Sequence, residues 1–341
     1  MTTALAPQAA SGASYIGVDL SLGGIEACQV VRTARADRVR NVRLGAAGKA
    51  IEYGAVFSRI ARALRRRGLE GNRIVVAAPP EKCVSAVLEM PAKNTEVPVS
   101  RLVQMELSRE HRLDPAGLES AWWDIPSPLR TGGGRPVMTV GCPSSVLREI
   151  DAAAGQAGLH IVAFDSRSSA LARGVCGPIA TPGQWRVVCD FSSGVPCVIV
   201  ATDGRVVIEH FAWESTVDGL YERVAAECRT ELAVARQLCQ VVPLRTATDR
   251  RAQSFAVPRV VRAVREFLDV AARGVAQCVQ YHHHKYGRID AGLSSVVVGE
   301  PWLVSRFIER QAESGETGWT AADDGFGAAR GLALWHGEDP A

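Results

Sequence analysis

The sequence lacks the features that define several protein classes. No stretch reaches about 18 consecutive apolar residues, so no transmembrane helix is expected. Charge of neither sign dominates, since 39 Lys and Arg residues balance 36 Asp and Glu residues, which does not favour nucleic-acid binding. The nine cysteines include no Cys-x-x-Cys pair, and several lie in apolar segments, which favours a reducing compartment without a disulfide framework. Three consecutive histidines at 282–284 would point in different directions on a helix, so they predict a solvated helix end and no metal site.

Two similar strand-turn-strand segments are present, one near the start of the sequence and one near its middle. Each has an aspartate at the end of an apolar strand, Asp19 in the first and Asp190 in the second, 171 residues apart (190 − 19). Small residues follow in both turns: Ser21, Gly23 and Gly24 in the first copy, and Ser192, Ser193 and Gly194 in the second. Backbone N–H groups in such turns can approach an anion, and a carboxylate beside them suits a hydrated Mg²⁺. A single hairpin of this kind is an ordinary turn, but the repetition predicts two related α/β domains that face a shared cleft.

The order of the expected elements also favours two lobes. Strands at about 15–20, 25–32 and 38–44 precede a helix, and a similar run of three strands restarts at 185 after a stretch rich in Pro and Gly. The predicted division begins with a loose tail at 1–14 and a first lobe at 15–176, which contains a small inserted α+β unit at about 81–142. A linker at 177–183 leads to a second lobe at 184–335, which has a helical stretch at 216–239, and a tail at 336–341 follows. The tail at 1–14 has no positive region before an apolar core, so it is not expected to be a signal peptide.

Three features of the first half resemble one family. The inserted unit has a strand-helix-strand-strand order, and residues 88–91 read Leu-Glu-Met-Pro before a Glu-containing helix and a short Pro loop. Residues 157–165 read AGLHIVAFD, and residues 168–173 read SSALAR, which is similar to the pattern AGL…vvDvesfAlaR. On these motifs and their order, the chain resembles the type IV pilus assembly protein PilM family of the actin/Hsp70-like ATPase superfamily, which is related to the cell-division actin homologue. The resemblance implies an α/β, actin-like (ribonuclease H-like) two-lobe fold around a nucleotide cleft.

The turns that would hold a nucleotide depart from the family pattern. The first loop, D-I-G-S-S-S-V-K in the family, has Leu22 for a Ser and Glu26 for the Lys, which brings negative charge toward a polyphosphate. The second loop, D-I-G-A, has Ser192 in place of its Gly, and the adenosine turn retains only Gly299 before Pro301, which has no N–H. The residues of this degenerate site are Asp19, Ser21, Gly23, Gly24, Asp190, Ser192, Ser193, Gly194 and Gly299. We therefore expect ATP with Mg²⁺ to bind weakly, if at all, without appreciable turnover, and Asp19 and Asp190 to cap their turns.

The resemblance implies a cytoplasmic scaffold and not an enzyme. In the family, PilM binds the N-terminal cytoplasmic peptide of the membrane protein PilN in a groove between the first domain and its inserted subdomain, a region that corresponds to about residues 81–142. Trp122 and Trp123 are candidate anchors for such a peptide; on a strand, one of them would lie in the core and the other would face outward. The implied location is the inner face of the cytoplasmic membrane, reached through partners.

Two alternatives remain open. The first is a working ATPase or kinase-like enzyme of the same superfold, which would bind ATP. The second is the actin-like cytoplasmic component of a type II secretion system, although such proteins normally carry a transmembrane helix and none is expected here. The sequence does not identify the machine that is served or decide whether the chain associates with itself.

Overall fold

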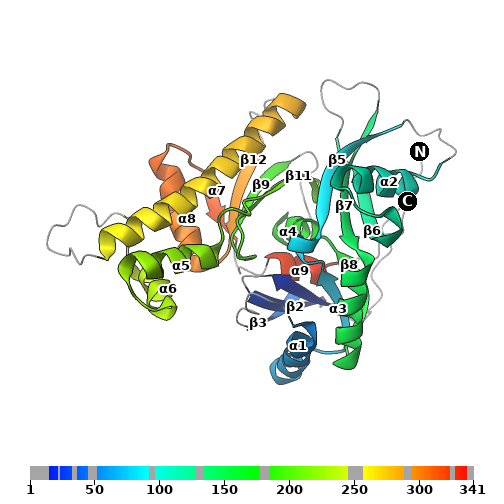
Figure 1. Cartoon of the computed structure of the whole chain (residues 1–341), viewed down its shortest axis with the longest axis horizontal. Coiled ribbons are helices and arrows are strands. Elements are labelled where there is room, and N and C mark those ends of the chain that lie inside the picture. The colour runs from blue at the N-terminus through cyan, green and yellow to red at the C-terminus, as the bar shows by residue number, and fades with distance from the viewer. Residues whose placement is uncertain are drawn as a thin grey trace.

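The computed structural model describes residues 15–335 apart from the segments 22–23, 33–36, 45–51, 92–96, 127–133, 177–183, 245–255, 288–292 and 323–326. The predicted tails and the predicted linker therefore lie outside the described residues. Two five-stranded sheets form two lobes, and a three-stranded sheet forms a smaller unit attached to the first lobe (Figure 1).

The first lobe is a mixed sheet in the order β3-β2-β1-β4-β8. The strands β1, β2 and β3 form antiparallel hairpins, whereas β4 runs parallel to β1 and β8 runs parallel to β4. The elements of this lobe are β1 (Ile16–Ser21), β2 (Gly24–Arg32), β3 (Asp37–Leu44), α1 (Tyr53–Arg67), β4 (Arg73–Ala77), α3 (Ser144–Gln156) and β8 (His160–Asp165). Helix α1 buries an apolar face that includes Phe57, Ile60 and Leu64 against the sheet, and it ends at Gly68, whose φ of 68° is left-handed.

The second lobe repeats this arrangement in the order β11-β10-β9-β12-β13. Its first three strands are again antiparallel, and β12 and β13 again continue the sheet in parallel. The elements of this lobe are β9 (Trp185–Asp190), β10 (Cys197–Thr202), β11 (Arg205–Phe211), α5 (Val217–Cys228), α6 (Leu232–Val241), α7 (Val257–Tyr286), β12 (Leu293–Val298), α8 (Pro301–Glu313) and β13 (Trp319–Ala321). The shared strand order confirms the predicted α/β fold of two related lobes.

One predicted element is wrong. The helical stretch expected at 216–239 is divided into α5 and α6, because Arg229 after α5 has a left-handed φ of 53°. The N–H of Thr230 then donates to the carbonyl of Ala225, which closes the helix end.

The inserted unit is an antiparallel sheet in the order β5-β7-β6 with one long helix. Its elements are β5 (Val84–Met90), α2 (Val99–His111), β6 (Leu118–Asp124) and β7 (Arg135–Pro143), with short 3₁₀ turns at Pro80–Lys82 and Pro115–Gly117. Helix α2 covers one face, where Val103 packs with Met90 and Val137. Since β7 is central, the outer edge of β6 has no strand partner among the described residues.

Two short helices cross at the centre of the molecule, α4 (Arg167–Cys176) and α9 (Gly327–Ala333) (Figure 1). Their backbones approach so closely that a Cβ on Gly174 would lie 1.8 Å from the carbonyl oxygen of Gly327, and a Cβ on Gly331 would lie 1.6 Å from that of Ala170. Helix α9 also packs on the first sheet, where Ala329 and Ala333 join a buried cluster with residues of β2. None of the described helices has the length and apolar character that a bilayer-spanning segment needs.

Candidate functional site

A buried arginine joins the two predicted aspartates at the centre of the molecule. Asp19 lies in β1 of the first lobe, Asp190 ends β9 of the second, and Arg167 is the first residue of α4. The Nε of Arg167 lies 3.0 Å from Oδ2 of Asp19, and its Nη1 lies 2.5 Å from Oδ2 of Asp190. Its Nη2 donates to Oγ of Ser192 at 2.8 Å. The prediction that Asp19 and Asp190 face a common site is therefore confirmed, but a side chain of the protein occupies the space between them.

The charges of this cluster are removed from water. Each of the three ionic side chains is at most 1% exposed. Burial raises the pKa of Asp19, Arg167 opposes this, and the nearby Asp190 adds to it. Burial disfavours the charged form of Arg167, but the attraction of both aspartates holds its pKa above the ordinary value. One guanidinium therefore pairs with both carboxylates, and its single positive charge offsets half of their combined charge when both are ionised.

The backbone of the second turn is engaged in its own hydrogen bonds. The N–H of Ser192 donates to Oδ1 of Asp190 at 2.9 Å, and the N–H of Gly194 donates to the carbonyl of Phe191 at 3.3 Å. The N–H of Val195 donates to Oγ of Ser193 at 3.3 Å. A phosphate bound in such a turn would need these N–H donors. Here they donate to groups of the turn itself, so the turn is bonded internally. Asp190 caps its turn as predicted.

Ser21 of the first turn and Gly299 of the adenosine turn lie close to groups of the second lobe. Ser21 Oγ donates to the carbonyl of Gly24 at 2.9 Å and lies 3.5 Å from the carbonyl oxygen of Ser192 in the other lobe. Gly299 has a φ of 146°, and a Cβ there would lie 2.9 Å from the Cβ of Phe191. Leu22 and Gly23 lie outside the described residues.

Glu26, which was expected to repel phosphate, pairs with an arginine of the neighbouring strand β3. It lies opposite Asp19 in the β1–β2 ladder and pairs with Arg43 of β3, whose Nη2 lies 2.5 Å from Oε1. Burial raises the pKa of Glu26 to about 7, although Arg43 opposes this shift.

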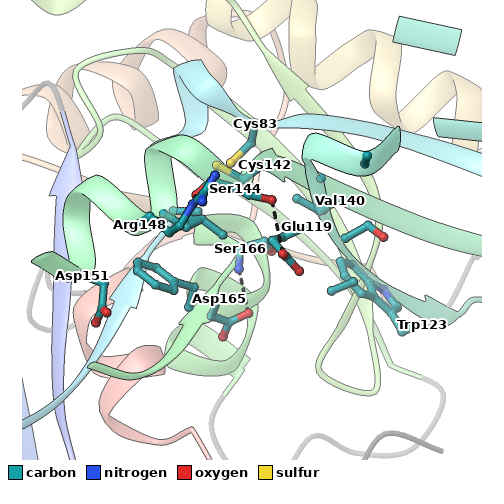
Figure 2. Close-up of a pocket in the computed structure, with 17 residues that line it drawn as sticks. Cys83, Glu119, Trp123, Val140, Cys142, Ser144, Arg148, Asp151, Asp165 and Ser166 are labelled. Atoms are coloured by element: carbon teal, nitrogen blue, oxygen red, sulfur yellow. Dashed lines mark hydrogen bonds between the residues drawn. The ribbon is translucent and has the colours of Figure 1, made fainter. Parts of the chain in front are cut away.

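A separate groove of about 710 Å³ lies between the inserted unit and the first lobe (Figure 2). One wall comes from β6 and β7, with Glu119, Trp123 and Val140. The opposite wall comes from α3 and the end of β8, with Arg148 and Asp151 among its residues. The groove thus offers apolar surface beside separated charges.

The two tryptophans lie on opposite faces of β6, as expected for neighbours on a strand, and both are half-buried. Trp122 packs beneath α2, and the guanidinium of Arg135 lies 5.0 Å from its ring centre. Trp123 lines the groove, and its Nε1 donates to the carbonyl of Val206 in the second lobe at 2.7 Å. Neither ring is fully buried or fully exposed, because α2 covers one face of β6 and the second lobe contacts the other. The role of Trp122 or Trp123 in partner binding stays a prediction.

The prediction of a solvated helix end at 282–284 is wrong for His282. His282 is 1% exposed, and its ring packs edge-on against Trp185 with the ring centres 4.2 Å apart. Burial lowers its pKa to about 4. No group of three or more potential metal ligands occurs among the residues that the structure describes.

Arg167 is the site residue that sequence reasoning missed. It lies in the segment that resembles the family pattern vvDvesfAlaR, at the position where that pattern has an acidic residue. The available signal was the change from an acidic residue to an arginine at that position. Two aspartates that face the space between the lobes are suitable partners for this positive charge.

Several solved structures match the overall architecture of this chain. The structure of PilM in a PilM–PilN type IV pilus biogenesis complex matches with a TM-score of 0.70 at 13% identity, over 94% of this chain and 98% of that chain. The chain has an actin-like fold of the PilM type. EutJ, an ethanolamine utilization protein from Carboxydothermus hydrogenoformans, matches with a TM-score of 0.54 at 14% identity, over 97% of this chain and 91% of that chain. MreB5 of Spiroplasma citri bound to ADP matches with a TM-score of 0.50 at 10% identity, over 95% of this chain and 96% of that chain.

These likenesses are confined to structure. No family model matches the sequence, and no curated protein matches it significantly. The predicted actin-like architecture and the resemblance to PilM are confirmed at the level of the fold.

Proposed function

We propose that this chain is a cytoplasmic scaffold of a type IV pilus or related secretion machine. It binds a short cytoplasmic peptide of a membrane-anchored, PilN-like partner, and through that partner it is held at the inner face of the cytoplasmic membrane. The observation that carries the proposal is the groove between the inserted unit and the first lobe, in a chain whose fold matches PilM from a PilM–PilN complex.

The walls of the groove suit an extended peptide. The free edge of β6 can accept an added strand through backbone hydrogen bonds. Trp123 and Phe164 supply apolar contacts along the groove. The carboxylates of Glu119 and Asp151 favour a basic side chain on the bound peptide.

The test is binding of a synthetic peptide that spans the cytoplasmic N-terminus of the PilN-like protein from the same genome. Fluorescence anisotropy should show saturable binding to the full chain. Ala121→Arg places a bulky charge at an exposed position in the middle of β6, on the groove wall, and should weaken binding by about 2 kcal/mol or more, which is roughly thirtyfold in Kd.

The matched control is Ala233→Arg on α6, which puts the same side chain on an exposed position of the second lobe. This variant should bind the peptide like the unmodified chain. No binding by the unmodified chain, or equal loss in both variants, would contradict binding in the groove.

We also propose that the central cleft does not use ATP. Arg167 already satisfies the two aspartates that would face a metal ion, and the amides of the second turn are already bonded. Calorimetry with ATP and Mg²⁺ should therefore detect no binding at millimolar nucleotide, which corresponds to less than about 4 kcal/mol of binding free energy. A micromolar dissociation constant would instead support the ATPase alternative.

A further inference from the structure

Two cysteines face each other at the neck of the inserted unit. Cys83 directly precedes β5, where the chain enters this unit, and Cys142 lies in the last part of β7, where the chain leaves it. The β5–β7 ladder ends with Val84 opposite Gly141, so the next position along it brings Cys83 opposite Cys142. Figure 2 shows the two sulfur atoms side by side at the groove.

The two thiols differ from the other described cysteines in lying together on the wall of the groove. Both line the groove; Cys83 is half-buried, and Cys142 retains 5% exposure. The interaction between the two neighbouring thiols raises the pKa of Cys83 and lowers that of Cys142. Cys142 is therefore the member that ionises first and can act as a nucleophile. The other described cysteines are buried in the cores, apart from the half-buried Cys228 on α5.

We propose that Cys83 and Cys142 are a dithiol–disulfide pair whose oxidation cross-links the neck of the inserted unit and weakens peptide binding in the groove. The second half of this proposal rests on the proposed function. An S–S bond is about 2.0 Å long, shorter than any contact between two thiols. Opposite residues of paired antiparallel strands already lie within the Cα separation that a disulfide spans, so its formation needs little backbone movement. It would cross-link the entry and exit strands and replace two separate thiols on the groove wall with one rigid link, whereas the groove described above belongs to the reduced form.

The chemistry is thiol–disulfide exchange with a small disulfide oxidant such as glutathione disulfide. The Cys142 thiolate attacks one sulfur of the oxidant, whose S–S bond breaks and releases one thiolate, which takes up a proton. The Cys83 thiolate then attacks the Cys142 sulfur of this mixed disulfide, and the second glutathione leaves as a thiol. The protein loses two hydrogens, and the oxidant is reduced to two thiols. Cytoplasmic disulfides of this transient kind serve redox sensing.

The first experiment needs no binding partner. The full chain is equilibrated in glutathione buffers of increasing oxidised fraction, alkylated, and mapped by mass spectrometry. We expect two thiols to be lost together, with Cys83 and Cys142 recovered in one linked peptide that dithiothreitol separates. Cys83→Ser and Cys142→Ser should each abolish this linkage, and Cys228→Ser, which removes a half-buried thiol outside the groove, should leave it unchanged. Two free alkylated thiols, or persistent glutathione adducts without the linkage, would overturn the proposal; peptide mapping of the unmodified chain decides this even if a variant fails to fold.

The second experiment measures the affinity of the PilN-like peptide for the reduced and the oxidised chain. Oxidation should weaken binding by about fivefold or more, the lower end of typical coupling between sites. By reciprocity, bound peptide should shift the redox equilibrium toward the dithiol by the same factor. A linkage that forms without any change in affinity would overturn the gating role. Absence of peptide binding in both states would instead refute the proposed function and leave the redox pair standing on the first experiment.

Discussion

Replacing Arg167 with methionine tests whether the buried arginine holds the two lobes together. Methionine keeps an unbranched apolar stem but removes the charge and the hydrogen bonds to Asp19, Asp190 and Ser192. Removing one partner of a buried ion pair typically costs 3–5 kcal/mol, because a charge remains buried without compensation. Here two carboxylates would remain, so we expect a loss of at least about 3 kcal/mol, a large part of the usual 5–15 kcal/mol of folding stability.

The loss should depend on pH in a definite direction. Arg167 lowers the pKa of Asp19 against the effect of burial, so its removal raises that pKa further. A carboxyl whose pKa is higher in the folded than in the unfolded state favours folding at low pH, and this advantage is lost as the pH rises above the unfolded value of 3.8. Arg167→Met should therefore be closer to the unmodified chain at pH 5 than at pH 8. Adding Asp19→Asn should restore part of the stability at pH 8, because it removes one uncompensated charge.

Urea unfolding followed by tryptophan fluorescence provides the measurement, with the midpoint compared at constant slope. Arg310→Met is the matched control, since Arg310 pairs with Asp269 while remaining 28% exposed, and such pairs contribute about 1 kcal/mol or less. If Arg167→Met lost no more than Arg310→Met, or if its loss were the same at pH 5 and pH 8, the central ion pairs would not connect the lobes as described.

Three further substitutions test other buried groups. Burial raises the pKa of Glu26 from 4.5 to about 7, so the folding stability should fall by up to about 3 kcal/mol as the pH rises through that window. Glu26→Gln should flatten this fall, which a series of urea midpoints at different pH values would measure. Burial lowers the pKa of His282 from 6.5 to about 4, so folding stability is lost as the pH falls through that window. His282→Phe keeps a ring against Trp185 and should make the melting temperature less sensitive to acid. Gly174→Ala should destabilise by about 3 kcal/mol or more, since its Cβ would overlap a backbone oxygen, whereas Gly54→Ala in α1, where nothing lies within 4 Å, should be tolerated in the same thermal assay.

The repeated hairpins were predictable because their signals are local. An apolar strand, an aspartate and a turn of small residues fix each hairpin, and repetition of the pattern at 171 residues indicates two lobes. The break between α5 and α6 was missed because a non-glycine residue, Arg229, adopts the left-handed conformation there. Nothing in the composition of that stretch identifies the position.

The contents of the cleft could not be obtained from the same patterns. Arg167 meets Asp19 from 148 residues away, and this contact depends on how α4 enters the space between the lobes. The tryptophan pair shows the same limit. Alternation along β6 separates the faces of Trp122 and Trp123, but whether a face is exposed depends on α2 and on the second lobe, which come from other parts of the chain.

The position of the fixed charges bears on how the lobes and the inserted unit are held together. Arg167 bonds to both lobes across the cleft, and α4 and α9 cross beside it with their backbones in contact, so the two lobes are held by groups that no ligand has to supply. The inserted unit is joined differently: two strands form its neck at Cys83 and Cys142, and the Trp123 indole donates to a carbonyl of the second lobe. None of these contacts of the inserted unit involves Arg167, Asp19 or Asp190. If the proposals above hold, signals reach the partner through this neck and not through hydrolysis of a nucleotide between the lobes.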